Sequence, residues 1–252
     1  MNQQTSVPRP RKAVNIIAMG SSRDDFMAGM LQEQRNDMFH NAETWAINYM
    51  AAIMPCDRVI HVDPVHAFLQ YPVVKQMCDN ALKWGVPFYT SAPHPAYSNH
   101  VMYPFHKVHE FFKSTYFNTT VAYTFALALM EGYTDIGLFG CDFSYPNIHI
   151  AESGRACVEF WMGQAASRGV RIAIAGHSTL MDMRESVDWN GQKVAQPYGF
   201  WLDPNVPPAM GGKLMHPEEM VKYAAEWQPF GARKSEVQAN ETSIVPIRGA
   251  VS

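Results

Sequence analysis

A short glycine-serine turn is the first feature of this sequence with binding chemistry. Gly20, Ser21 and Ser22 follow an apolar run at residues 14–19 and precede a segment expected to form a helix from Arg23. Small residues allow backbone N–H groups to approach a phosphate, and a helix N-terminus adds about half of a positive charge. The same residues are common in ordinary turns and helix caps. The turn therefore predicts either an anion-binding site or a simple strand-to-helix connection.

A second set of hydroxyl groups stands at the start of a strongly apolar helix, which we predict at residues 119–131. Thr119 and Thr120 begin this segment. Hydroxyl and free N–H groups at a helix start favour an anion. As an alternative, Thr119 serves only as the N-cap of the helix.

Three predicted strands end at polar residues. The strand at residues 44–48 ends at Asn48, the strand at residues 57–64 reaches Asp63, and the strand at residues 135–143 runs into a corner with Gly140 and Asp142. Amide and carboxylate groups suit the hydroxyls of a sugar and the edge of a base. Asp142 could equally be a simple turn former.

Bringing these residues together requires an alternation of strands and helices, and the sequence contains one. Apolar runs predict strands at residues 14–19, 44–48, 57–64, 87–90, 135–143 and 170–175, and helices after residue 23 and at residues 71–84, 119–131 and 152–167. Residues 91–103 are expected to form a loop. The pattern predicts an α/β fold, a Rossmann-like and mostly parallel sheet with helices on both faces. Such sheets bind ligands beyond the carboxyl ends of their strands.

The alternation also suggests how the chain is divided. We expect a flexible tail at residues 1–12 and a Rossmann-like nucleotide-binding domain at residues 13–185. An irregular extension with one helix at residues 217–227 should follow at residues 186–228, and a second flexible tail at residues 229–252.

Composition and charge limit the classes of function. The formal net charge of −3 gives no global basis for nucleic-acid binding, although a local basic patch at residues 97–113 leaves it open. No run approaches the ~20 apolar residues of a membrane span, and the N-terminus is polar, so we expect a soluble cytoplasmic protein. The 16 Met and 6 Trp leave apolar surface for a homo-oligomer.

The sequence contains no metal-binding motif. Four cysteines lie far apart, which favours free thiols over a zinc site or a disulfide framework: Cys56, Cys78, Cys141 and Cys157. We therefore expect no cofactor. Magnesium enters only with a bound triphosphate, held by some of the carboxylates of Asp24, Asp25, Asp57 and Asp63.

The stretch from Tyr116 to Phe143 resembles a known family. It contains Tyr116-Phe117-Asn118-Thr119-Thr120, then Gly132-Tyr133, then Leu138-Phe139-Gly140-Cys141-Asp142-Phe143. This block resembles the bacterial sialyltransferases of glycosyltransferase family 42 and the related family-115 domain of unknown function, which includes a hydroxymethylpterin pyrophosphokinase-like branch. Those proteins carry Thr-Ser-Gly, Leu-Gly-Tyr and Leu-x-Gly-Ile/Met-Asp-Phe at the same spacing. Further landmarks follow in the same order over residues 13–182.

The resemblance implies a role for each candidate residue. It places Gly20, Ser21 and Ser22 near the donor phosphate, with Thr119 and Thr120 at a helix N-terminus that faces it. It also implies that Asn48 and Asp63 lie near the base or ribose, and that Gly140 and Asp142 line the same cleft. The sequence is similar, too, to a group of phage-encoded proteins of similar length, which would place it in a host cytoplasm.

His149 and Asp142 are the catalytic candidates. His149 lies in the region where the sialyltransferases carry a loop histidine proposed as general base, and a neutral imidazole can take a proton from an acceptor hydroxyl. An exposed or structural histidine fits the sequence equally well. Glu152 and Arg155, one helical turn apart, form either a wall of the site or a surface pair.

Two departures from the family leave the donor open. The first turn lacks the Asn of the family's Gly-Asn-Gly-Pro-Ser, and Val121 replaces the Gly of Thr-Ser-Gly. The sequence predicts a glycosyltransferase-like enzyme that moves a sugar from a nucleotide-activated donor to an unidentified acceptor. The alternatives are an ATP- and Mg-dependent pyrophosphokinase-like phosphoryl transferase, and a non-catalytic nucleotide-binding phage accessory protein.

Overall fold

A computed structural model describes residues 11–31, 42–181, 185–187, 193–195 and 215–226. The chain divides into two compact units, Met1–Asp182 and Met183–Ser252. The tails expected at residues 1–12 and 229–252 lie outside the described residues, apart from Arg11 and Lys12. Much of the extension expected at residues 186–228 lies outside them as well.

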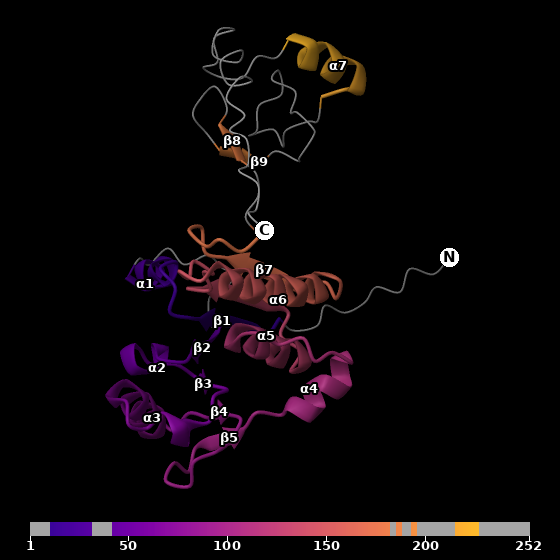
Figure 1. Cartoon of the computed structure of the whole chain (residues 1–252). Coiled ribbons are helices and arrows are strands. Elements are labelled where there is room, and N and C mark those ends of the chain that lie inside the picture. The colour runs from indigo at the N-terminus through magenta and orange to yellow at the C-terminus, as the bar shows by residue number, and fades with distance from the viewer. Residues whose placement is uncertain (1–10, 32–41, 182–184, 188–192, 196–214, 227–252) are drawn as a thin grey trace, which may run out of the picture. The chain divides into compact units, whose positions relative to one another are not determined.

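Seven parallel strands form the sheet of the first unit (Figure 1). They are β1 (Ala13–Ile17), β2 (Glu43–Ile47), β3 (Arg58–Ile60), β4 (Phe88–Thr90), β5 (His100–Met102), β6 (Asp135–Phe139) and β7 (Arg171–Ile174), in the order β5-β4-β3-β2-β1-β6-β7. The chain builds outward from β1 to β5 and then returns, so that β6 pairs with the free side of β1. The strand order reverses between β1 and β6, where open α/β sheets bind their ligands. The predicted α/β, Rossmann-like fold is confirmed.

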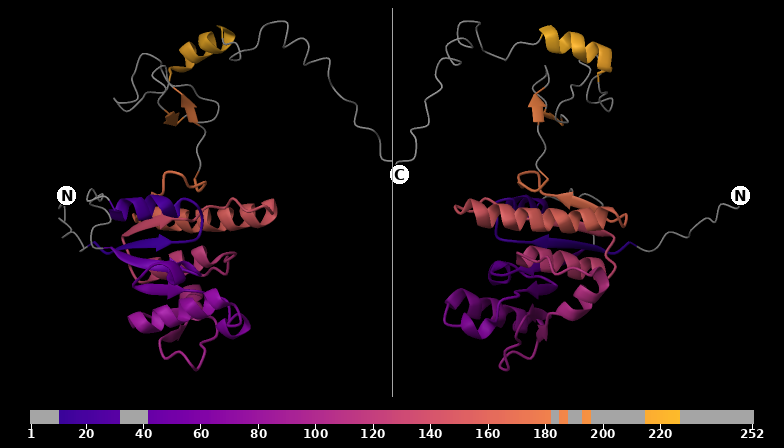
Figure 2. Two further views of the ribbon diagram at one scale, coloured as in Figure 1. Left: turned by 90° about the vertical axis from the view of Figure 1, so that its left-hand side faces the viewer. Right: turned by 45° about the vertical axis from the view of Figure 1, so that its right-hand side comes forward.

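Helices cover both faces of this sheet. Packed against one face are α1 (Arg23–Leu31), α2 (Met50–Ile53), the short 3-10 turn η1 (Val65–Ala67) and α3 (Pro72–Trp84); α4 (Phe105–Phe112), α5 (Thr120–Met130) and α6 (Ile148–Ala166) pack against the other. Figure 2 shows this arrangement from two further sides. β1 supplies Val14 and Ile16 to one apolar cluster and Ile17 to the other. Burial on both faces explains why its sequence is almost continuously apolar.

Local capping signals define where several helices begin and end. Pro72 occupies the first turn of α3, and Gly85 closes that helix with a left-handed φ of 68°. The Thr119 hydroxyl accepts a hydrogen bond from the Val121 N–H and so caps α5. The Asn147 side chain accepts from the N–H groups of His149 and Ile150 at the start of α6. These side chains satisfy backbone groups that a helix end leaves without partners.

Several elements differ from the sequence-based expectation. The loop predicted at residues 91–103 contains the edge strand β5, and α2 and α4 were not predicted. All three are at most eight residues long, too short to show a clear hydrophobic period. The helix expected from Glu152 begins at Ile148, because Asn147 caps it one turn earlier. His149 therefore lies in the first turn of α6 rather than in a loop.

The second unit contains a two-stranded antiparallel pair, β8 (Glu185–Val187) and β9 (Lys193–Ala195), and the helix α7 (Pro217–Glu226). In the part of the chain that the structure describes, no helix is long and apolar enough to span a membrane. The four cysteines are free thiols; Cys56 is half-buried and the other three are buried.

Candidate functional site

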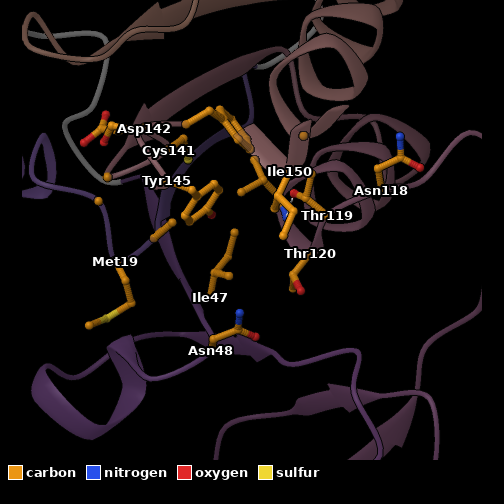
Figure 3. Close-up of a pocket in the computed structure, with 17 residues that line it drawn as sticks. Met19, Ile47, Asn48, Asn118, Thr119, Thr120, Cys141, Asp142, Tyr145 and Ile150 are labelled. Atoms are coloured by element: carbon orange, nitrogen blue, oxygen red, sulfur yellow. Dashed lines mark hydrogen bonds between the residues drawn. The ribbon is translucent and has the colours of Figure 1, made fainter. Parts of the chain in front are cut away.

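A cavity of about 430 Å³ opens at the carboxyl end of the sheet, beside the β1/β6 reversal. Its walls come from the loops after β1, β2 and β6, from the N-terminus of α5 and from the first two turns of α6 (Figure 3). α5 begins at this end because it connects β5 to β6 and must run back antiparallel to the strands. The chain path alone therefore aims the positive end of a helix at the cavity.

The cavity brings together half of the residues singled out from the sequence. Lining it are Gly20, Asn48, Thr119, Thr120, Gly140 and Asp142. The remaining candidates do not line it: Ser21, Ser22, Asp63, His149, Glu152 and Arg155. Asp63, His149 and Glu152 are exposed, whereas Ser22 is buried.

Asp142 holds the loop after β1 against the loop after β6. Its carboxylate accepts a hydrogen bond from the Ser22 N–H at 2.6 Å, from the Ser22 hydroxyl at 2.5 Å and from the Ser21 hydroxyl at 3.2 Å. The Ser22 hydroxyl in turn accepts from the Gly140 N–H at 2.9 Å. Ser22 is 1% exposed and Asp142 is 6% exposed. We call this arrangement of Ser21, Ser22, Gly140 and Asp142 the clasp. In Figure 3 the Asp142 carboxylate points away from Tyr145 and Asn48.

Two glycines allow the clasp to close. A Cβ on Gly20 would lie 2.6 Å from both the Gly140 carbonyl oxygen and the Asp142 carboxylate. A Cβ on Gly140, whose φ is +64°, would lie 2.2 Å from the Ala18 carbonyl oxygen. The Gly20 N–H donates to the Gly140 carbonyl at 2.8 Å. The N–H groups of Gly20, Ser22 and Gly140 are thus engaged within the protein, and the small residues serve a close approach of two loops.

The N-terminus of α5 offers hydrogen-bond donors to the cavity. The Thr119 hydroxyl is occupied by its capping bond to Val121 at 3.0 Å. Thr120, by contrast, lines the cavity, and its hydroxyl has no partner among the described residues. Hydroxyl and N–H groups at the start of an 11-residue helix form a favourable site for an anion.

Asn48 forms the wall at the end of β2. Its φ of 51° is left-handed, a conformation that asparagine tolerates better than most residues, and its N–H donates to the Ile60 carbonyl at 3.0 Å. Its side-chain Oδ1 lies 2.9 Å from Nδ1 of the buried His61. Sequence reasoning missed His61, although a polar residue directly after the apolar pair Val59 and Ile60 was a signal that could have found it.

The remaining walls are neutral. Among the described residues, no lysine, arginine or histidine lines the cavity, and the single carboxylate there, Asp142, is engaged in the clasp. Burial raises the pKa of Tyr145 and of the Cys141 thiol, so both keep their protons at neutral pH. Within the described residues there is no group of three or more metal-ligating side chains. An anion bound here would be held by neutral donors and the α5 helix.

The α6 candidates lie beside the cavity. Ile150 and Gly154, one turn apart, line it, and a Cβ on Gly154 would lie 2.7 Å from the Phe143 ring. His149 precedes Ile150 and is exposed, as is Glu152, while Arg155 is half-buried. The helix thus presents Ile150 and Gly154 to the cavity. Glu152 lies two residues from both and therefore on the opposite side of the helix, with His149 and Arg155 to either side of Glu152.

No family model and no curated protein matches the sequence. Among solved structures, the chain is similar to the sialyltransferase CstII from Campylobacter jejuni in complex with cytidine-5'-monophosphate, a substrate analogue, at 18% identity over 67% of this chain and 82% of that chain, with a TM-score of 0.45. CstII in complex with CMP-3FNeuAc is similar at 17% identity over 84% of this chain and 99% of that chain, with a TM-score of 0.45. The apo form of an alpha-2,3-sialyltransferase from Campylobacter jejuni is similar at 19% identity over 71% of this chain and 81% of that chain, with a TM-score of 0.39.

Proposed function

We propose that this protein binds a nucleotide-activated sugar in the cavity beside β1 and β6 and transfers the sugar to an acceptor hydroxyl. The observation that carries the proposal is the convergence of the α5 N-terminus, the Asn48 amide and the clasp on one cavity at the sheet reversal. The sequence resemblance to glycosyltransferase family 42 supports the same activity. The acceptor is not specified by these residues.

The cavity suits a reaction in which the nucleotide is the leaving group. As the bond between the sugar and the phosphate breaks, negative charge grows on the phosphate oxygen. The Thr120 hydroxyl and the N-terminus of α5 would stabilise that charge, since donors fixed in place act more strongly on charge that develops in the transition state. Asn48, across the cavity, would hold the base or the ribose.

We assign the acceptor side of the reaction to the edge formed by α6. His149 is exposed beside Ile150, which lines the cavity, so its imidazole is free to meet an acceptor that approaches from solution. There it would take the proton of the acceptor hydroxyl as the acceptor oxygen bonds to the sugar.

Isothermal titration calorimetry tests the proposal. Purified protein would be titrated with CMP, UMP, AMP, GMP and their nucleotide sugars, each with EDTA and each with Mg²⁺. We expect at least one nucleotide and its sugar to bind in EDTA, because the cavity supplies neutral donors and its single carboxylate, Asp142, is already engaged by Ser21 and Ser22. ATP would be titrated under the same two conditions. Binding of ATP only with Mg²⁺ would instead indicate phosphoryl transfer, and no binding of any nucleotide would overturn the proposal.

A further inference from the structure

His61 lies behind the cavity wall and makes one polar contact with it. The ring is 2% exposed and packs against Phe88 and Phe68, with ring centroids 6.1 and 6.4 Å away. Its Nδ1 atom lies 2.9 Å from the Asn48 Oδ1, and its buried Nε2 atom has no partner among the described residues. Buried polar groups normally make such a hydrogen bond, and this one joins the ring to a residue that lines the cavity.

The chemistry of this contact fixes where the proton lies. Nε2 is buried without an acceptor, whereas Nδ1 faces the Asn48 amide, so the one hydrogen of a neutral ring belongs on Nδ1 and the amide turns its oxygen toward it. Burial lowers the pKa of His61, and the ring is neutral at neutral pH with a single N–H. Nε2 is therefore a bare lone pair, which is less costly to bury without a partner than a second N–H would be.

The same bond fixes which way the Asn48 amide faces. With its oxygen turned toward His61, the amide nitrogen is left on the cavity side, as Figure 3 shows. The two N–H groups of that nitrogen have no partner among the described residues. An asparagine without His61 could rotate its amide and offer oxygen or nitrogen alike, because the two ends are nearly equal in shape.

We propose that His61 is a positioning residue that locks the Asn48 amide with its N–H groups toward the cavity, so that this wall accepts only hydrogen-bond acceptors of a nucleotide. A base carbonyl, a ring nitrogen with a lone pair or a ribose oxygen fits this wall, whereas an exocyclic amino group does not. This inference rests on the proposed nucleotide-binding function and adds to it the residue that sets the direction of one contact.

Three substitutions at one position test the inference. The side-chain nitrogen of asparagine reaches about the position of imidazole Nδ1, and that of glutamine about the position of Nε2. His61→Asn keeps a donor for Asn48, His61→Gln moves it, and His61→Phe removes it while preserving an aromatic ring. In calorimetry with CMP and UMP, we expect His61→Asn to bind within about twofold of wild type and the other two about tenfold more weakly. A ring that served only for packing would give the reverse order, with His61→Phe nearest to wild type.

Two further measurements separate the possible failures. Wild-type protein labelled with ¹⁵N should show His61 with a protonated Nδ1 and an unprotonated Nε2 by NMR, without any ligand; the opposite tautomer overturns the proposal. In an Asn48→Gly background, which keeps the left-handed backbone, His61→Phe should have no further effect on affinity. If wild type binds neither CMP nor UMP, nor AMP or GMP, the proposed function fails and this inference with it. If wild type binds and all three His61 variants bind equally, only the positioning role fails.

Discussion

The carboxylate of Asp142 accepts two hydrogen bonds from Ser22, one from its N–H at 2.6 Å and one from its hydroxyl at 2.5 Å, although the residues are 120 positions apart in the chain. Hydrogen bonds to a charged group are worth about 1.5–3 kcal/mol, and a buried donor left without its partner costs about as much. The clasp therefore contributes to the stability of the fold as well as to the shape of the cavity.

Removing the clasp carboxylate should destabilise the protein. Asp142→Asn leaves a similar shape but replaces one accepting oxygen with a donor that faces the Ser22 donors. We expect the free energy of unfolding in urea to fall by about 2–3 kcal/mol. Ser21→Ala is the matched control, because Ser21 is exposed and its hydroxyl is 3.2 Å from the carboxylate; it should cost less than about 1 kcal/mol. Equal losses in the two variants would contradict the role given to Ser22.

Gly140 should be intolerant of any side chain. Gly140→Ala combines a left-handed φ with a contact of 2.2 Å to the Ala18 carbonyl, so we expect a loss of about 3 kcal/mol or more in the free energy of unfolding. Gly163→Ala offers a matched control inside α6, where a Cβ meets nothing within 4 Å. That variant should gain about 0.5–1 kcal/mol, since alanine favours a helix over glycine. A stable Gly140→Ala protein would refute the close approach of the two loops.

The two neighbouring threonines should have separable effects. Thr119→Val removes the cap of α5 and should cost about 1 kcal/mol of stability. Thr120→Val removes only a hydroxyl that faces the cavity, so it should leave the unfolding temperature nearly unchanged and weaken nucleotide binding by about tenfold. Thermal unfolding and calorimetry on both variants test this, and a Thr120→Val protein with wild-type affinity would exclude that hydroxyl from the site.

His149→Ala should slow sugar transfer without changing the affinity for the nucleotide. Under the proposed function, kcat for sugar transfer should fall by about 10²- to 10⁴-fold, the contribution usual for a general base. The affinity for CMP or UMP and the unfolding temperature should stay at the wild-type values, because the side chain is exposed and does not line the cavity. Unchanged turnover would remove His149 from the mechanism.

Stability should decline in mild acid because of His100. Burial, together with the neighbouring His94 and His61, lowers the pKa of His100 from the usual 6.5 of a histidine to about 4, and the ring is stacked on Phe88 and Tyr97. Between pH 4 and 6.5, His100 is therefore protonated in the unfolded chain and neutral in the folded chain. The stabilisation from the neutral ring is complete above pH 6.5 and is lost as the pH falls toward 4. His100→Phe should flatten the urea-unfolding free energy over this range; a parallel profile would contradict the assignment.

The strands and helices that could be predicted from the sequence are those defined by long local runs of apolar residues. β1 and β6 are buried on both faces and their apolar runs are long enough to recognise, as is the mostly apolar sequence of α5. β5 and α4 were missed because so few residues carry little periodicity. Thr120 and Asn48 both line the cavity, because strand ends and helix starts meet at one edge of a parallel sheet.

Contacts between segments that are far apart in the chain could not be predicted from the sequence. From the sequence, the Asp142 carboxylate was expected to be available to a ligand. In the structure it accepts hydrogen bonds from Ser22, which lies 120 positions earlier in the chain. The alternative in which the glycine-serine turn is a structural connection describes the bonding of Ser22 well. His61 was missed because its partner Asn48 follows a different strand, β2, and the sequence does not show that the two side chains meet.

The place of β1 in the sheet also gives the chain an order of assembly. One neighbour of β1 is β2, close behind it, but the other is β6, which begins only at Asp135, past the midpoint of the 252 residues. During synthesis, β1, an interior strand of the sheet, therefore has one edge without its partner until most of the first unit has emerged. The nascent protein is most prone to aggregate in this interval, and a chain cut short before Asp135 would keep that exposed edge permanently.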